Sequence, residues 1–272
     1  MFETAAFAQR TEQRGYATLW TPESRGRNVL SHAAWLLART ERLIVATGIA
    51  NIYARDAMAM ANAHRGLNEQ SGGRFLLGLG VSHAYFVEGL RRLEYGKPVA
   101  TMKAYLEGMA AATYAAVAPA SAPKTVLAAL GPKMTELAGL MTDGAHPCNV
   151  PPEHTRQARE ILGGGKLLCV EQGAILETDA GRARAAAREN LAIYLKLPNY
   201  LNHWKRLGFS DSDFAGGGSD RLIDAVVVWG DEKAIRQRIT EHWQAGADHV
   251  CVLPMGANGG VDERLLELLR PL

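Results

Sequence analysis

The sequence predicts an α/β fold, a (β/α)8 TIM barrel in which parallel strands are surrounded by helices. Helical stretches and short apolar runs alternate along the chain, which is the order that produces βαβ units. Several helical stretches end at a glycine suited to a left-handed C-cap, such as Gly15 and Gly72. The chain has 272 residues, close to the roughly 250 that such a barrel uses.

The apolar runs supply one strand fewer than the eight of a closed barrel. The expected strands are 17–20, 43–47, 75–79, 125–129, 143–145, 167–175 and 249–253. The first strand is missing, because the chain opens with a helix over 2–14. Either the true start lies upstream or the barrel lacks this strand. The run 225–229 is rich in β-formers but short, so it fits either a strand or a buried helical turn.

Helices are expected where apolar residues follow helical spacing and capping residues precede them. Asp56 is expected to cap a helix on which Met58 and Met60 pack as core. Pro132 and Pro152 suit the first turns of two further helices, where the missing N–H costs nothing.

The whole chain, 1–272, is expected to be a single barrel domain with two interruptions. A charged loop covers 88–97. The segment 199–221 contains aromatic residues and then three glycines, which fits either a mobile lid with a hinge or a disordered excursion. Near the end of the chain, Trp243 is expected to continue a buried helical stripe.

Composition excludes several classes of protein. The net charge of +2 gives no footprint for nucleic acid or an acidic membrane. No apolar run is long enough to span a bilayer, and the N-terminus lacks a signal-peptide pattern. The cysteines Cys148, Cys169 and Cys251 form no CxxC motif, which indicates reduced thiols in the cytoplasm and no zinc site. We therefore expect a cytoplasmic protein without a metal.

Several motifs, in this order and spacing, carry a resemblance to a known family. They are Gly15–Tyr16 with Leu19–Glu23, Thr47–Asp56, Arg74–His83, Ala129–Pro132, Asp143–Pro147, Pro152–Thr155 and Gly246–Asp248. Together they resemble the bacterial-luciferase-like monooxygenase superfamily, over nearly the whole chain except the missing strand and 199–221. The nearest subgroup is similar to enzymes that use a deazaflavin, coenzyme F420, in place of a flavin.

The resemblance implies a cofactor site at the strand ends. It places a cis peptide at Gly48–Ile49, where the backbone supports the cofactor ring, with Asn51 nearby. Gly80 to His83, which include Val81 and Ser82, follow a strand and offer backbone N–H groups and a hydroxyl. These residues do not form a dinucleotide-binding fingerprint, because the third glycine is absent.

Other candidate site residues lie at further strand-to-helix junctions. Gly131 opens a helix whose N–H groups can face an anion, and His146 follows another strand. Glu23 and His83 are the candidate catalytic residues. The subgroup often pairs the acidic residue with a following histidine, whereas this chain has Ser24, so the identity of the proton donor stays open.

The resemblance implies an oxidoreductase that transfers hydride between coenzyme F420 and a small organic molecule. One alternative is a monooxygenase that uses FMN and oxygen, and another is a degenerate, non-catalytic barrel that binds a cofactor. The family also implies a homodimer, and an unpaired strand edge favours association. No nucleic acid or membrane partner is expected.

Overall fold

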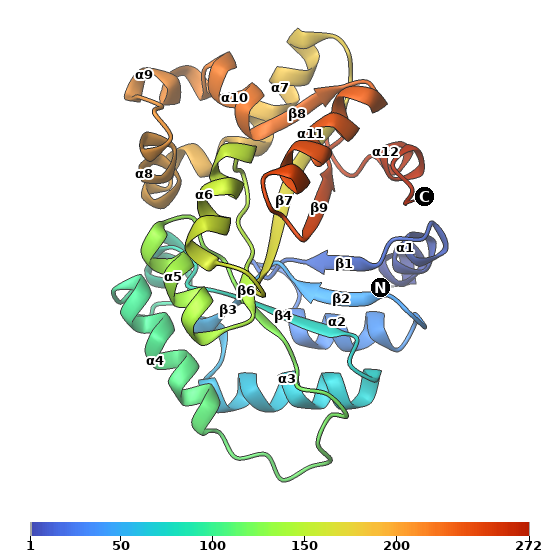
Figure 1. Ribbon diagram of the computed structural model, residues 1–272, viewed down its shortest axis with the longest axis vertical. Coiled ribbons are helices and arrows are strands. Elements are labelled where there is room, and N and C mark those ends of the chain that lie inside the picture. The colour runs from blue at the N-terminus through green and yellow to red at the C-terminus, as the bar shows by residue number, and fades with distance from the viewer. Residues whose placement is uncertain (1, 272) are drawn as a thin grey trace. The chain divides into compact units, whose positions relative to one another are not determined.

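The computed structural model describes residues 2–271, whose named strands pair in parallel (Figure 1). The chain divides into two compact units. The first unit extends to Ala129 and includes 136–144, and the second contains 130–135 and 145–270. The α/β fold with parallel strands agrees with the sequence prediction, and the first described element is a helix.

The first unit contains a parallel sheet with the strand order β1-β2-β4-β5, and β3 pairs with β4 beyond the end of β2. Its strands are β1 (Thr18–Thr21), β2 (Ile44–Thr47), β3 (Ala50–Asn51), β4 (Phe75–Gly80) and β5 (Thr125–Leu127). Its helices are α1 (Phe2–Gln13), α2 (Val29–Leu37), η1 (Ile52–Ala54), α3 (Ala57–Ser71), the π-helix η2 (Tyr85–Leu90) and α4 (Pro98–Ala111). Helix α2 packs on β2, and α3 packs on β4 and α4.

Two elements cross the boundary between the units. Helix α5 (Pro132–Met141) begins in the second unit and continues in the first, and β6 (Gly144–Ala145) has one residue in each. In the second unit, β7 pairs with both β8 and β9. These strands are β7 (Leu167–Leu176), β8 (Val227–Gly230) and β9 (His249–Pro254).

In the second unit, several short helices follow one another between β7 and β8. The helices are α6 (Pro152–Leu162), α7 (Ala180–Leu191), η3 (Tyr194–Lys196), α8 (Pro198–Arg206), α9 (Asp211–Phe214), η4 (Ala215–Gly217), α10 (Asp220–Val226), α11 (Glu232–Gln244) and α12 (Glu263–Leu268). Helix α11 packs on β7, β8, β9 and α6, and α12 packs on β9.

The expected caps and helix starts are confirmed. The Asp56 carboxylate accepts a hydrogen bond from the backbone N–H of Ala59 at 2.9 Å, and Gly72 closes α3 with a φ of 65°. The ambiguous run 225–229 proves to contain both structures, because α10 ends at Val226 and β8 begins at Val227. Part of the expected charged loop 88–97 belongs to the π-helix η2.

Two predictions about buried side chains are wrong. Met60 is fully buried, but Met58 is 50% exposed because it lies on the other side of α3. Trp243 is 55% exposed, and its neighbour His242 is buried instead. The His242 imidazole accepts a hydrogen bond from the Thr155 hydroxyl at 2.8 Å and donates one to the Gln172 side chain at 2.8 Å. Polar partners on α6 and β7 therefore allow a histidine to take the core position.

The segment 199–221 is folded, so the alternative of a disordered excursion is wrong. Trp204 is fully buried, and its indole N–H donates to the carbonyl of Asn149 at 3.1 Å. Phe209 belongs to the same hydrophobic cluster, in which Leu222 and Ile223 of α10 also pack. A lid function for this segment stays a prediction.

Candidate functional site

The carboxyl ends of β1, β2, β3 and β4 meet in the first unit. Thr21 pairs with Thr47, and Asn51 pairs with Gly80. Between β2 and β3 the peptide bond Gly48–Ile49 is cis, as the sequence predicted. The chain leaves the β2 ladder here and rejoins β4 two residues later, which creates a bulge that we define as residues 48–51.

Glycine residues of β4 leave room for this bulge. A Cβ at Gly78 would lie 2.0 Å from the carbonyl oxygen of Thr47, and a Cβ at Gly80 would lie 2.5 Å from the Ile49 side chain. The Thr47 hydroxyl donates to the carbonyl of Gly78 and accepts from its N–H, both at 2.8 Å. The Thr47 side chain is therefore hydrogen-bonded to the Gly78 backbone at a position where any residue larger than glycine would collide with the carbonyl oxygen of Thr47.

Glu23 holds the bulge in place. Its Oε2 accepts from the N–H of Asn51 at 2.9 Å, and its Oε1 accepts from the N–H of Val29 at 3.3 Å. Oε1 also pairs with the guanidinium of Arg55, and the side chains of Glu23 and Arg55 are only 4% and 10% exposed. Both carboxylate oxygens are therefore engaged with donors of the protein itself.

The predicted segment 80–83 has an unusual backbone. Ser82 adopts a positive φ of 56°, and its carbonyl accepts from the Tyr95 hydroxyl at 3.2 Å. Burial raises the pKa of Tyr95 to about 12, so this hydroxyl stays a donor at neutral pH. The carbonyl of His83 accepts from the N–H groups of Phe86 and Val87, each at 2.9 Å, and so begins η2. Val81, Ser82 and His83 are all half-buried.

Asn51 caps the next turn. Its side-chain oxygen accepts from the N–H of Tyr53 at 2.9 Å, and the residue is buried. The Tyr53 hydroxyl in turn accepts from the N–H of Gly96 at 3.0 Å, and the rings of Tyr53 and Tyr95 lie 5.8 Å apart. Two loops that are distant in sequence are thereby fixed next to the bulge.

In the second unit, two histidines donate hydrogen bonds to the carbonyl oxygen of Leu130, the residue before Gly131. His154 donates to the carbonyl of Leu130 at 3.2 Å and His203 donates to the same oxygen at 3.1 Å. Burial lowers the pKa of both histidines, to about 4 for His154 and about 3 for His203, so both rings are neutral at pH 7. The second nitrogen of each ring is buried without a hydrogen-bond partner among residues 2–271.

Arg206 extends from α8 toward Gly131. A Cβ at Gly131 would lie 3.3 Å from its Nη2, so glycine admits the guanidinium there. Arg206 forms no ion pair within residues 2–271, although most of the other arginines in this unit do. An unpaired cation beside the first turn of α5 is suited to an anion such as a phosphate.

His146 is buried at the end of β6, with 3% of its surface exposed. Its Nδ1 donates to the carbonyl of Cys169 at 2.7 Å. Burial lowers its pKa to about 4, which keeps the imidazole neutral at pH 7.

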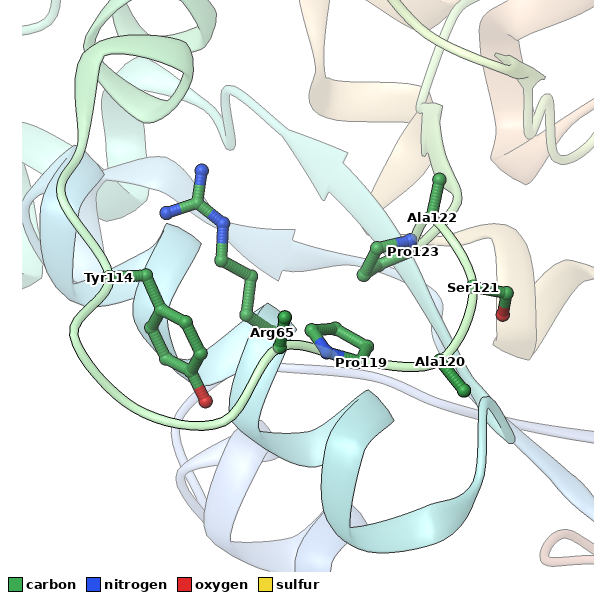
Figure 2. A pocket seen from close by; sticks show the side chains of 8 residues that line it. Arg65, Tyr114, Pro119, Ala120, Ser121, Ala122 and Pro123 are labelled. Atoms are coloured by element: carbon green, nitrogen blue, oxygen red, sulfur yellow. The ribbon is translucent and has the colours of Figure 1, made fainter.

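The hollow drawn in Figure 2 lies away from these strand ends. Its volume is about 400 Å³, and the loop 118–123, Arg65 and Tyr114 line it. The loop leads into the start of β5, and Ser121 lies beside Gly73 just before β4. The hollow is therefore at the amino ends of the strands, where residues of a barrel generally serve stability.

Sequence reasoning identified the strand-end glycines and Glu23 but missed three residues. Arg55, Arg206 and His203 come from loops or helices whose packing partners are far away in sequence. An arginine gives no local signal that its partner is a buried carboxylate. Within residues 2–271, no group of histidine, cysteine or acidic side chains is arranged to hold a metal, and no helix has the length and apolar character of a membrane span.

The model of the luciferase-like monooxygenase family matches residues 2–249. A putative coenzyme F420-dependent oxidoreductase of Mycobacterium tuberculosis is 24% identical, over 93% of this chain and 90% of the relative.

Two solved structures share the fold. The coenzyme F420-dependent tetrahydromethanopterin reductase from Methanopyrus kandleri has a TM-score of 0.77 at 18% identity, over 98% of this chain and 93% of that one. The oxygenating constituent of a type II Baeyer–Villiger monooxygenase from Pseudomonas putida, in complex with FMN, has a TM-score of 0.65 at 13% identity, over 98% and 90% of the two chains.

Proposed function

Because the chain belongs to the luciferase-like monooxygenase family, we propose that it is an oxidoreductase that transfers hydride between coenzyme F420 and a small organic substrate. The observation that carries this proposal is the bulge 48–51, which Glu23 and Arg55 hold from one side and the glycines of β4 accept from the other. It presents backbone at strand ends, where barrel enzymes bind their cofactors.

The cofactor is proposed to contact residues from several strand-to-helix junctions. They are Gly48, Ile49, Asn51, Gly80, Val81, Ser82, Gly131 and His146. In the second unit, Gly131 and Arg206 have features that suit the binding of an anion such as a phosphate group. The coenzyme supplies the hydride chemistry, and the protein binds, orients and shields it.

The two candidate catalytic residues are given different roles. His83 is proposed to donate a hydrogen bond or a proton at the polar edge of the ring, because it lies half-buried directly after β4. Glu23 is proposed to position the bulge, since both of its oxygens already accept from Val29, Asn51 and Arg55. In this proposal the role of Glu23 does not depend on a histidine at position 24.

The runner-up function is an FMN-dependent monooxygenase, which the likeness to the FMN-bound structure supports. The printed name of the Mycobacterium tuberculosis relative favours the deazaflavin. We further propose a homodimer. Strands β1 and β9 each pair with a single strand among residues 2–271, and exposed strand edges favour association.

Native mass spectrometry of the protein, purified from a host that makes both cofactors, tests the proposed function. We expect a bound mass equal to that of coenzyme F420, because the bulge 48–51 presents backbone groups at the strand ends. The same spectrum reports the number of subunits. Bound FMN without F420 would instead support the monooxygenase.

A further inference from the structure

The hollow of about 400 Å³ lies beside the loop that joins α4 to β5, entirely within the first unit. This loop, which we call the α4–β5 loop, covers residues 112–124 and contains neither helix nor strand. Arg65 of α3 lines the hollow together with Tyr114 and the loop residues 118–123, so we call it the Arg65 hollow (Figure 2). Its volume falls within the roughly 300–1,000 Å³ of small-molecule sites.

The α4–β5 loop is fixed at both ends. At its start, Nη1 of Arg65 donates to the carbonyl of Ala112, the C-cap of α4, at 2.9 Å. At its end, the carbonyl of Lys124 accepts from a backbone N–H of β4 at 3.1 Å. Between them, Pro119 and Pro123 each restrict the backbone angle φ. The hollow is therefore largely formed before a ligand arrives, which lowers the entropic cost of binding.

The Arg65 guanidinium has donors that the protein does not use. A guanidinium offers five N–H donors, and the bond to Ala112 uses one of them. Within residues 2–271, Arg65 forms no other hydrogen bond and no ion pair. The Tyr114 ring adds only a cation–π contact, with its centroid 5.8 Å from Cζ of Arg65. Because Nη1 faces Ala112, the edge of the guanidinium formed by Nε and Nη2 stays available to a ligand.

The rest of the lining is mostly apolar and carries no negative charge. The α4–β5 loop contains no aspartate or glutamate, alanine is its commonest residue, and its single charged residue is Lys124. The hydroxyl groups of Tyr114 and Ser121 are the polar side-chain groups that accompany Arg65 in the lining. A cation that is half-buried among alanine and proline lacks a compensating carboxylate from the protein.

A ligand that complements this lining combines an anion with an apolar body. The Nε and Nη2 edge of a guanidinium matches a carboxylate through two parallel N–H···O bonds, which are stronger than bonds between neutral groups. The alanine methyl groups and the proline rings can pack against an apolar body. A free phosphate fits less well, because its remaining oxygens would face these apolar groups without donors.

We propose that the Arg65 hollow is a second ligand site, which binds a small carboxylate with a flat apolar body, such as benzoate. It is separate from the bulge 48–51. The α4–β5 loop leads into the amino ends of β4 and β5, whereas the bulge lies where the strands have their carboxyl ends. The inference does not depend on the proposed function, because no cofactor and no redox step enters it.

Titration of the full-length protein with benzoate, followed by ¹H–¹⁵N NMR, tests the site and its position. We expect a Kd of about 1 mM or tighter, and shifts of the amide signals of Ala120, Ser121 and Ala122. Acetate lacks the apolar body and benzyl alcohol lacks the charge. Each should bind at least about tenfold more weakly than benzoate, because each loses one of the two contributions to binding.

Variants of Arg65 separate recognition of the carboxylate from support of the loop. Arg65→Met removes the charge, so the Kd for benzoate should rise at least about tenfold. Arg65→Lys keeps the charge and can still donate to Ala112, which protects the fold. It lacks the Nε and Nη2 edge, so its Kd should rise about threefold or more. The matched control is Arg156→Met, at an exposed arginine of α6, which should bind benzoate like the wild type.

Three results would overturn the proposal. They are amide shifts at Gly80 to His83 without shifts in the α4–β5 loop, wild-type affinity for benzoate in both Arg65 variants, and equal affinities of the wild type for benzoate and acetate. The proposed function is tested separately by binding of coenzyme F420. If F420 fails to bind while benzoate binds as expected, the proposed function is lost and the Arg65 site stands. If F420 binds and benzoate does not, the reverse holds.

Discussion

Replacement of Gly78 by alanine should destabilise the protein by roughly 3 kcal/mol or more, which is the upper range for overpacking in a core. The added Cβ would lie 2.0 Å from the backbone oxygen of Thr47. Since this neighbour is backbone, no rotamer change can relieve the collision, and the two hydrogen bonds between Thr47 and Gly78 must be distorted. Urea unfolding followed by circular dichroism measures the effect.

Gly26→Ala is the matched control, because nothing lies within 4 Å of a Cβ at that position. We expect its unfolding midpoint to stay within experimental error of the wild type. If Gly78→Ala were as stable as Gly26→Ala, the close packing of β4 against the end of β2 would be incorrect.

Replacement of Glu23 by alanine should cost roughly 3–5 kcal/mol of unfolding free energy, the amount typical of breaking a buried ion pair. The substitution leaves the buried Arg55 guanidinium without its carboxylate and removes the acceptor for the N–H of Asn51. Because Asn51 is the last residue of the bulge, the affinity for coenzyme F420 should fall as well. Chemical denaturation and fluorescence titration measure the two effects.

Glu232→Ala is the control for this prediction, since it removes an exposed ion pair with Arg236. Exposed pairs contribute about 1 kcal/mol or less. A Glu23→Ala protein that retains wild-type stability and F420 affinity would show that Glu23 does not position the bulge, and would return it to consideration as an acid.

The sequence predicted the elements that are defined by local rules. Local residues define several helix ends, namely Asp56, Gly72 and Pro152. These ends could therefore be recognised from the sequence without knowledge of the fold. The family motif at 47–56 predicted the bulge. The alternation of helices and apolar runs predicted the parallel strands.

The errors lie where tertiary partners override local pattern. Trp243 continues an apolar stripe, yet His242 is buried because Thr155 and Gln172 satisfy both of its nitrogens. The glycines and polar residues of 199–221 are typical of a flexible loop. The segment is folded nevertheless, because the buried Trp204 indole N–H donates a hydrogen bond to the carbonyl oxygen of Asn149.

The identity of the cofactor is the most direct question for this chain. Titration of the protein, freed of bound cofactor, with coenzyme F420 and with FMN compares the two under the same conditions. We expect F420 to bind with micromolar affinity or better, which corresponds to about −8 kcal/mol, and FMN to bind at least tenfold more weakly. Tight binding of FMN with none of F420 would contradict the deazaflavin assignment, and binding of neither would indicate a non-catalytic barrel.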